Sequence, residues 1–171
     1  MFEYSPTDLS NQIAALPPQI FWWLRTLAIF NVMSIFWIKR VQARWILAAI
    51  VFIAFTNVPI FLSLGLVKLG SIPHLLVWIP LLVYLAREIR LGRVDVKTTF
   101  GVWCFAVILL NLTSVVFDLR DGIQYLLGDT APMTAATVAK GFPIATTIAI
   151  FLSYVAVAAY ALRLDRLIRR D

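Results

Sequence analysis

Three asparagines lie inside the most apolar stretches of this 171-residue chain, at Asn31, Asn57 and Asn111. A buried amide without a partner costs roughly a few kcal/mol, so these side chains should face other parts of the protein. Amides in such positions either hold helices together through hydrogen bonds or line a polar pathway. The sequence favours hydrogen bonding between helices and keeps a polar intramembrane site as the alternative.

Arg25, Asp118 and Asp121 are charged residues within or next to apolar segments. Intramembrane charges tend to pair, so an ion pair of Arg25 with Asp118 or Asp121 is one hypothesis. In the other, Arg25 extends its guanidinium to the membrane surface. The two aspartates could form an outer-face catalytic site with His74, the only histidine, if all three shared one cleft.

The remaining reactive residue types give no catalytic or metal-binding pattern. Cys104 is the only cysteine and lies in an apolar stretch, which is typical of a small buried residue. One histidine cannot provide a bis-histidine haem site, and the spacings of zinc ligands do not occur. The sequence therefore predicts no catalytic residue, no metal site and no cofactor.

The elements that must position these residues follow from composition. The chain is 61% hydrophobic and 14% charged, whereas an average soluble domain is about half apolar and about a quarter charged. This predicts an all-α, polytopic transmembrane helical bundle, since a span needs about 20 mainly apolar residues. Five segments qualify within a single integral membrane domain, residues 1–171: 20–38, 45–66, 69–86, 100–118 and 143–162. Four spans would result if the first segment were re-entrant or interfacial.

Most lysines and arginines lie in alternate connections, after the first, third and fifth segments. Basic residues mark cytoplasmic loops, so the pattern predicts an N-terminus outside and a C-terminus inside. It also accounts for the net charge of +6 without a nucleic-acid partner. The layout is typical of a multi-pass protein of a bacterial-type plasma (inner) membrane.

The C-terminal third carries two further features. Residues 119–142 are expected to form an external connection that includes a short interfacial helix, with continuation of the fourth segment as helix to Leu127 as the alternative. Small residues in the fifth segment are spaced to form one helix-packing stripe: Ala145, Ala149, Ser153 and Ala156. Such a stripe lets helices approach closely, within the chain, against a protein partner or in a homo-oligomer. The basic tail that follows could meet anionic lipid headgroups.

Three functions are compatible with these patterns. The first is a non-enzymatic accessory or scaffolding component of the membrane. The second is a small-solute transporter or channel with a polar site at the three asparagines. The third is a membrane enzyme with an outer-face Asp/His site. The first is favoured, because packing features are better specified in the sequence than reactive ones.

Overall fold

The computed structural model describes residues 3–133, which form helices joined by short connections. The helices are α1 (Pro6–Ala14), α2 (Pro18–Val32), η1 (Met33–Trp37), α3 (Val41–Leu64), η2 (Lys68–Gly70), α4 (Ser71–Arg90) and α5 (Thr99–Leu126). No strand occurs in this part of the chain, apart from one isolated bridge between Val67 and Pro132. The fifth expected span, 143–162, and its small-residue stripe lie outside the described residues.

The other four expected segments are confirmed as helices long and apolar enough to cross a membrane. They cover Pro18–Trp37, where α2 continues into η1, and then Val41–Leu64, Lys68–Arg90 and Thr99–Leu126. Their 20 to 28 residues correspond to about 30 to 42 Å of helix, which spans a hydrocarbon core about 30 Å thick. The fold is thus all-helical over residues 3–133, with four membrane-capable helices.

Helix α5 extends further than the fourth apolar segment. Residues 119–126, expected to begin the external connection, continue α5 without interruption. Gly122 does not break the helix, because it packs against Ser71 and Leu75 of α4. The helix ends just before Gly128, whose φ of 100° is a conformation that glycine adopts most readily.

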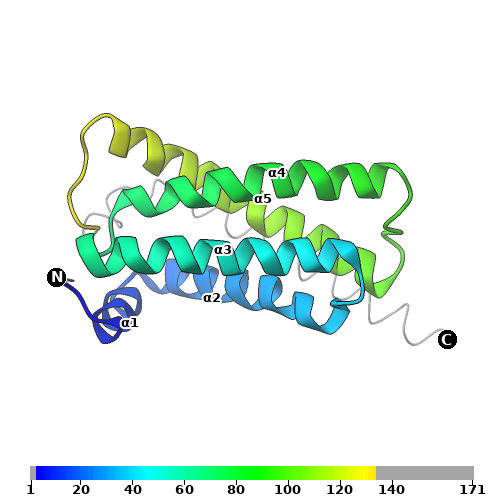
Figure 1. Cartoon of the computed structure of the whole chain (residues 1–171), viewed down its shortest axis with the longest axis horizontal. Helices are drawn as coiled ribbons and strands as arrows, with labels where there is room; N and C mark the ends of the chain where they lie inside the picture. The colour runs from blue at the N-terminus through cyan, green and yellow to red at the C-terminus, as the bar shows by residue number, and fades with distance from the viewer. Residues whose placement is uncertain (1–2, 134–171) are drawn as a thin grey trace.

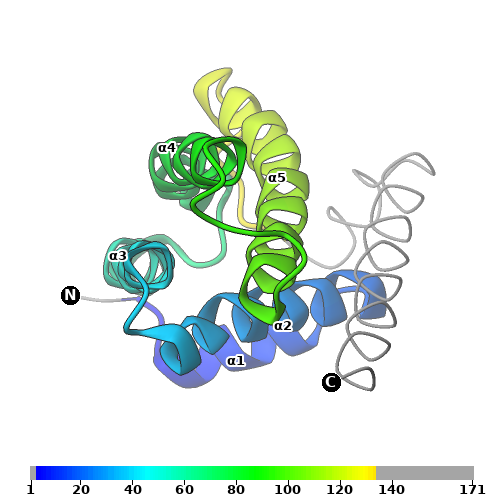
Figure 2. The same ribbon diagram turned by 90° about the vertical axis from the view of Figure 1, so that its right-hand side faces the viewer.

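The four long helices run side by side (Figure 1). Viewed down the bundle, α5 lies between α4 and α2, and α3 packs against α4 and α2 on the other side (Figure 2). In the most apolar stretch of α5, 56% of the residues are buried, against 22–28% in the other three helices. The Trp103 indole Nε1 of α5 donates to the Phe30 carbonyl oxygen of α2 at 3.0 Å. Helix α5 is therefore the central helix of the described bundle.

The two ends of the bundle differ in charge. One end, here called the basic end, carries the connections 38–40 and 91–98 (Figure 1). These connections and the adjoining turns of α3 and α4 contain most of the described cations: Lys39, Arg40, Arg44, Arg87, Arg90, Arg93 and Lys97. The other end, here the cavity end, carries α1, the connection 65–70 and the last turns of α5. Lys68 and Arg120 are its basic residues, and both have acidic partners.

Candidate functional site: a polar row in an apolar cavity

A cavity of about 340 Å³ lies at the cavity end, between α1, α2, α3, α4 and α5. Its apolar wall comes from the first three of these helices and includes Leu9, Ile13, Leu24 and Phe61. Polar side chains from α4 and α5, together with Asn57 of α3, line the opposite side. An apolar wall with a few convergent polar groups is typical of small-molecule binding sites, whose volumes start at about 300 Å³.

Four polar side chains form a continuous row along this cavity. The Asn57 amide Nδ2 lies 2.9 Å from His74 Nε2, and His74 Nδ1 lies 3.1 Å from Asp118 Oδ1. The Ser114 hydroxyl donates to the other Asp118 oxygen, Oδ2, at 3.1 Å. The row thus links α3, α4 and α5 through the single histidine of the chain.

The direction of these hydrogen bonds follows from the chemistry of the amide. An amide nitrogen only donates, so the contact with Asn57 requires His74 Nε2 to accept. The proton of the neutral imidazole is then on Nδ1, which donates to Asp118. The Asn57 oxygen, Oδ1, is buried and has no hydrogen-bond partner among the described residues. The imidazole already accepts from Asn57, so this oxygen is the one acceptor of the row that no described residue engages.

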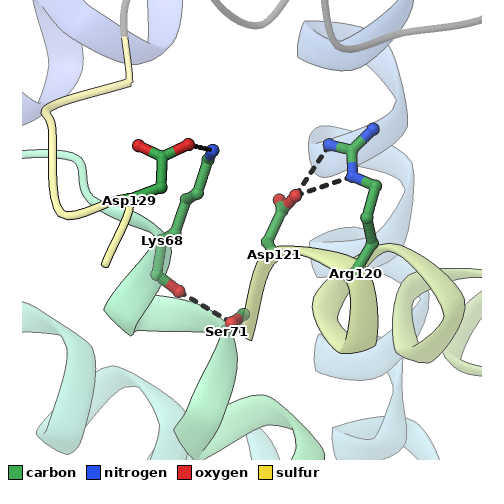
Figure 3. Close-up of polar contacts among 5 residues, drawn as sticks. All are labelled: Lys68, Ser71, Arg120, Asp121 and Asp129. Atoms are coloured by element: carbon green, nitrogen blue, oxygen red, sulfur yellow. Dashed lines mark hydrogen bonds and ion pairs between the residues drawn. The ribbon is translucent and has the colours of Figure 1, made fainter. Parts of the chain in front are cut away.

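Two ion pairs lie beside the same cavity, which Lys68, Arg120 and Asp121 also line. Figure 3 shows the pairs, Lys68 with Asp129 and Arg120 with Asp121. Arg120 donates from Nε and Nη2 to Asp121 Oδ1, at 2.9 and 2.7 Å. Lys68 binds Asp129, and its carbonyl oxygen accepts a hydrogen bond from the Ser71 hydroxyl at 2.7 Å. These charges are paired with each other, and the uncharged acceptor of the row without a partner is the Asn57 oxygen.

The three asparagines, for which one shared polar site was the alternative interpretation, are divided between two places. Asn31 and Asn111 are fully buried and exchange hydrogen bonds, at 2.9 and 3.1 Å, across α2 and α5. The Asn31 amide nitrogen also donates to the Leu27 carbonyl oxygen at 2.8 Å. Asn57 lies apart from this pair, in the cavity. All three amides thus form hydrogen bonds between helices, and Asn57 also lines the candidate site.

The three charged residues for which an ion pair was one hypothesis, Arg25, Asp118 and Asp121, have other neighbours. The Arg25 guanidinium carbon lies 4.4 Å from the centroid of the Phe21 ring, a cation–π distance. Asp118 binds His74 and Ser114, as described above, and Asp121 binds Arg120. His74, Asp118 and Asp121 all line the same cavity, which is the convergence that an outer-face Asp/His site requires.

Helix α1 contributes to the site but was not predicted as a helix. Its signal is a capping box, in which the Ser5 hydroxyl accepts from the Asp8 backbone and the Asp8 carboxylate accepts from the Ser5 backbone. The hydrogen bonds from the Ser5 side chain and backbone lower the pKa of Asp8, so the cap is ionised near neutral pH. Pro6 at the first helical position, with Leu9 and Ile13 one turn apart, completes a pattern that could have revealed this helix.

No group of three or more histidines, cysteines, aspartates or glutamates able to hold a metal ion occurs within residues 3–133. Cys104 is fully buried in the core.

Neither a family model, nor a curated protein, nor a solved structure matches this chain. The class is therefore defined by the fold and the site alone. Four apolar, membrane-capable helices are compatible with an integral membrane protein. The polar row lines the cavity at one end of these helices.

Proposed function

We propose that this chain is a non-enzymatic integral membrane component that binds a small amphiphilic molecule in the cavity at the outer face. The observation that carries the proposal is the row from Asn57 through His74 to Asp118, set against an apolar wall. The buried, unpartnered Asn57 oxygen would accept a hydrogen bond from a ligand hydroxyl or amine. The apolar part of the ligand would lie against α1 and α3.

Binding explains the row better than covalent catalysis does. The Ser114 hydroxyl donates to Asp118, and the Ser71 hydroxyl donates to a backbone carbonyl. A nucleophilic serine would instead donate to the imidazole, which here accepts from Asn57. Asp118 thus orients His74 as a hydrogen-bond acceptor, without a nucleophile next to it.

A solute pathway through the bundle has less support. The Asn31 and Asn111 amides, which would have lined it, are fully buried and satisfy each other. The cavity reaches only Asn57. A binding role for Asn57 at one face, with Asn31 and Asn111 joining α2 to α5, therefore accounts for all three asparagines.

We propose that the cavity end faces outward and the basic end faces the cytoplasm of a bacterial-type inner membrane. The concentration of lysines and arginines at the basic end supports this orientation. In a Cys104→Ala background, a membrane-impermeant maleimide should label Ser5→Cys in intact cells. It should label Lys97→Cys only after permeabilisation. Labelling in the reverse order would overturn the orientation.

Ligand binding can be tested with 4-(trifluoromethyl)phenol, a probe with one hydroxyl donor and an apolar ring. With the full chain in phosphatidylcholine nanodiscs, ¹⁹F NMR should show saturable binding above simple partition into lipid. Asn57→Leu should weaken this binding about tenfold, the effect of losing one hydrogen bond worth about 1.4 kcal/mol. His74→Phe should weaken it as well, because the Asn57 amide then loses the imidazole that positions it.

The matched control is Thr26→Val, which removes a hydroxyl of α2 that does not line the cavity. This variant should bind the probe as the native chain does. Thermal midpoints of all variants show whether they remain folded. Equal binding by the native chain, Asn57→Leu and His74→Phe, all of them folded, would refute the proposed site.

A further inference from the structure

A second cavity, of about 530 Å³, lies on the outer surface between α3 and α4. The cavity exists where the side chains are small, at Ala48 and Ala49 of α3 and at Pro80 of α4. Larger side chains border it, among them Phe52, half exposed, and Leu76, 69% exposed. The result is an apolar groove parallel to the helices, on a face with many exposed apolar side chains.

The basic-end side of this groove is marked by aromatic side chains. The Trp45 and Tyr84 rings close it, with centroids 6.5 Å apart. Tryptophan and tyrosine favour the boundary between hydrocarbon and headgroups, because each combines an apolar ring with one polar group. From Trp45 to Phe52 the helix rises about 10 Å, compared with a leaflet of about 15 Å.

Two arginines lie in one layer just beyond these rings. The Gln42 amide donates to Glu88 Oε2 at 2.8 Å, which sets position 42 of α3 opposite position 88 of α4. The contact between the Trp45 and Tyr84 rings likewise sets position 45 of α3 opposite position 84 of α4. Arg44 and Arg87 fall between these two pairs of positions, one on each helix, and both are exposed.

Glu88 does not neutralise these arginines. Its two carboxylate oxygens accept from Gln42 and from Arg93 Nη1, the latter at 2.9 Å. Arg44 and Arg87 form no ion pair with any residue between 3 and 133. The groove therefore ends at two cations whose charge is available to an anion.

We infer that this groove is a binding site for an anionic phospholipid. One acyl chain lies along Ala48 and Pro80, and the phosphate lies between Arg44 and Arg87. The inference needs the chain to be in a membrane but does not depend on a ligand at the opposite end. Each cation near an anionic lipid contributes about a factor of five to its affinity.

Native mass spectrometry of the full chain, purified in detergent and mixed with equal amounts of dioleoylphosphatidylglycerol and dioleoylphosphatidylcholine, tests the site. The native chain should retain the anionic lipid at least fivefold better. The double variant Arg44→Gln/Arg87→Gln should lose this preference, whereas Lys39→Gln/Lys97→Gln, with the same charge change at the same end, should keep it. Equal loss in both double variants would show a diffuse surface attraction and overturn the inference.

The acyl chain has a separate test. Ala48→Phe fills the groove at an exposed position and leaves both arginines in place. It should lower retention of the anionic lipid about fivefold, and free inorganic phosphate at millimolar concentration should not displace the lipid from the native chain. Unchanged retention in Ala48→Phe, or displacement by phosphate, would show that a headgroup alone is bound and would overturn the groove as the site.

Discussion

Replacing Asn111 with leucine should lower the free energy of unfolding by about 2 kcal/mol, because the oxygen of the fully buried Asn31 amide would lose its donor. Asn31→Leu should have a similar effect. The double variant should be less destabilised than the two single effects together, by about 1 kcal/mol, since it leaves no orphan amide. The measurement is unfolding of the purified chain in mixed micelles, followed by circular dichroism.

The control for this pair is Thr56→Val. The Thr56 hydroxyl donates only to carbonyl oxygens of its own helix, those of Phe52 and Ile53. Its removal should change stability by less than about 0.6 kcal/mol, the average found for membrane hydrogen bonds. Strictly additive effects of Asn31→Leu and Asn111→Leu would mean that the two amides do not stabilise each other.

Gly101→Ala should be at least as damaging, with a loss of about 3 kcal/mol, at the upper end of the usual overpacking cost. A Cβ atom at Gly101 would lie 1.9 Å from the Asp95 carbonyl oxygen and 2.8 Å from the Val96 Cα. Both are backbone atoms, so the turn before α5 would have to move. Thermal unfolding in detergent measures the effect, and a lower yield of folded chain should accompany it.

Gly122→Ala is the matched control in the same helix. The nearest atom to a Cβ there is the Ser71 hydroxyl oxygen at 3.3 Å, the end of a small side chain that can rotate. In a helix, alanine is favoured over glycine by about 1 kcal/mol, so this variant should be close to neutral or slightly stabilising. If Gly101→Ala were also stabilising, the tight contact between Asp95 and α5 would be refuted.

The four apolar segments within residues 3–133 could be predicted from sequence because hydrocarbon imposes a local rule. Every backbone polar group must be satisfied inside its own segment, so length and apolar character suffice to indicate a helix. The predicted end of the fourth segment, residue 118, is less accurate, because α5 continues to Leu126 beyond the apolar residues. Residues 119–126 contain Arg120 and Asp121, yet α5 continues, because these two side chains satisfy each other.

Helix α1 could be predicted only in principle. The capping box of Ser5 and Asp8 is a local signal, but nine residues are too few for a stable isolated helix. The helix is held by its tertiary position, where Leu9 and Ile13 face the cavity. Its contribution to the site therefore depends on packing that its own sequence does not specify.

The sequence by itself determined the class of fold, the membrane-capable helices and which residues are too polar to face lipid. Only the tertiary structure decided their partners: Asn31 with Asn111, and Asn57 with His74 and Asp118. A helix specifies the depth of a side chain through its rise per residue, but its rotation and its neighbour depend on how side chains from several helices interlock. Hydrogen bonding between residues 17 to 80 positions apart is a property of that packing, and it places the single histidine of the chain in a cavity next to Asn57.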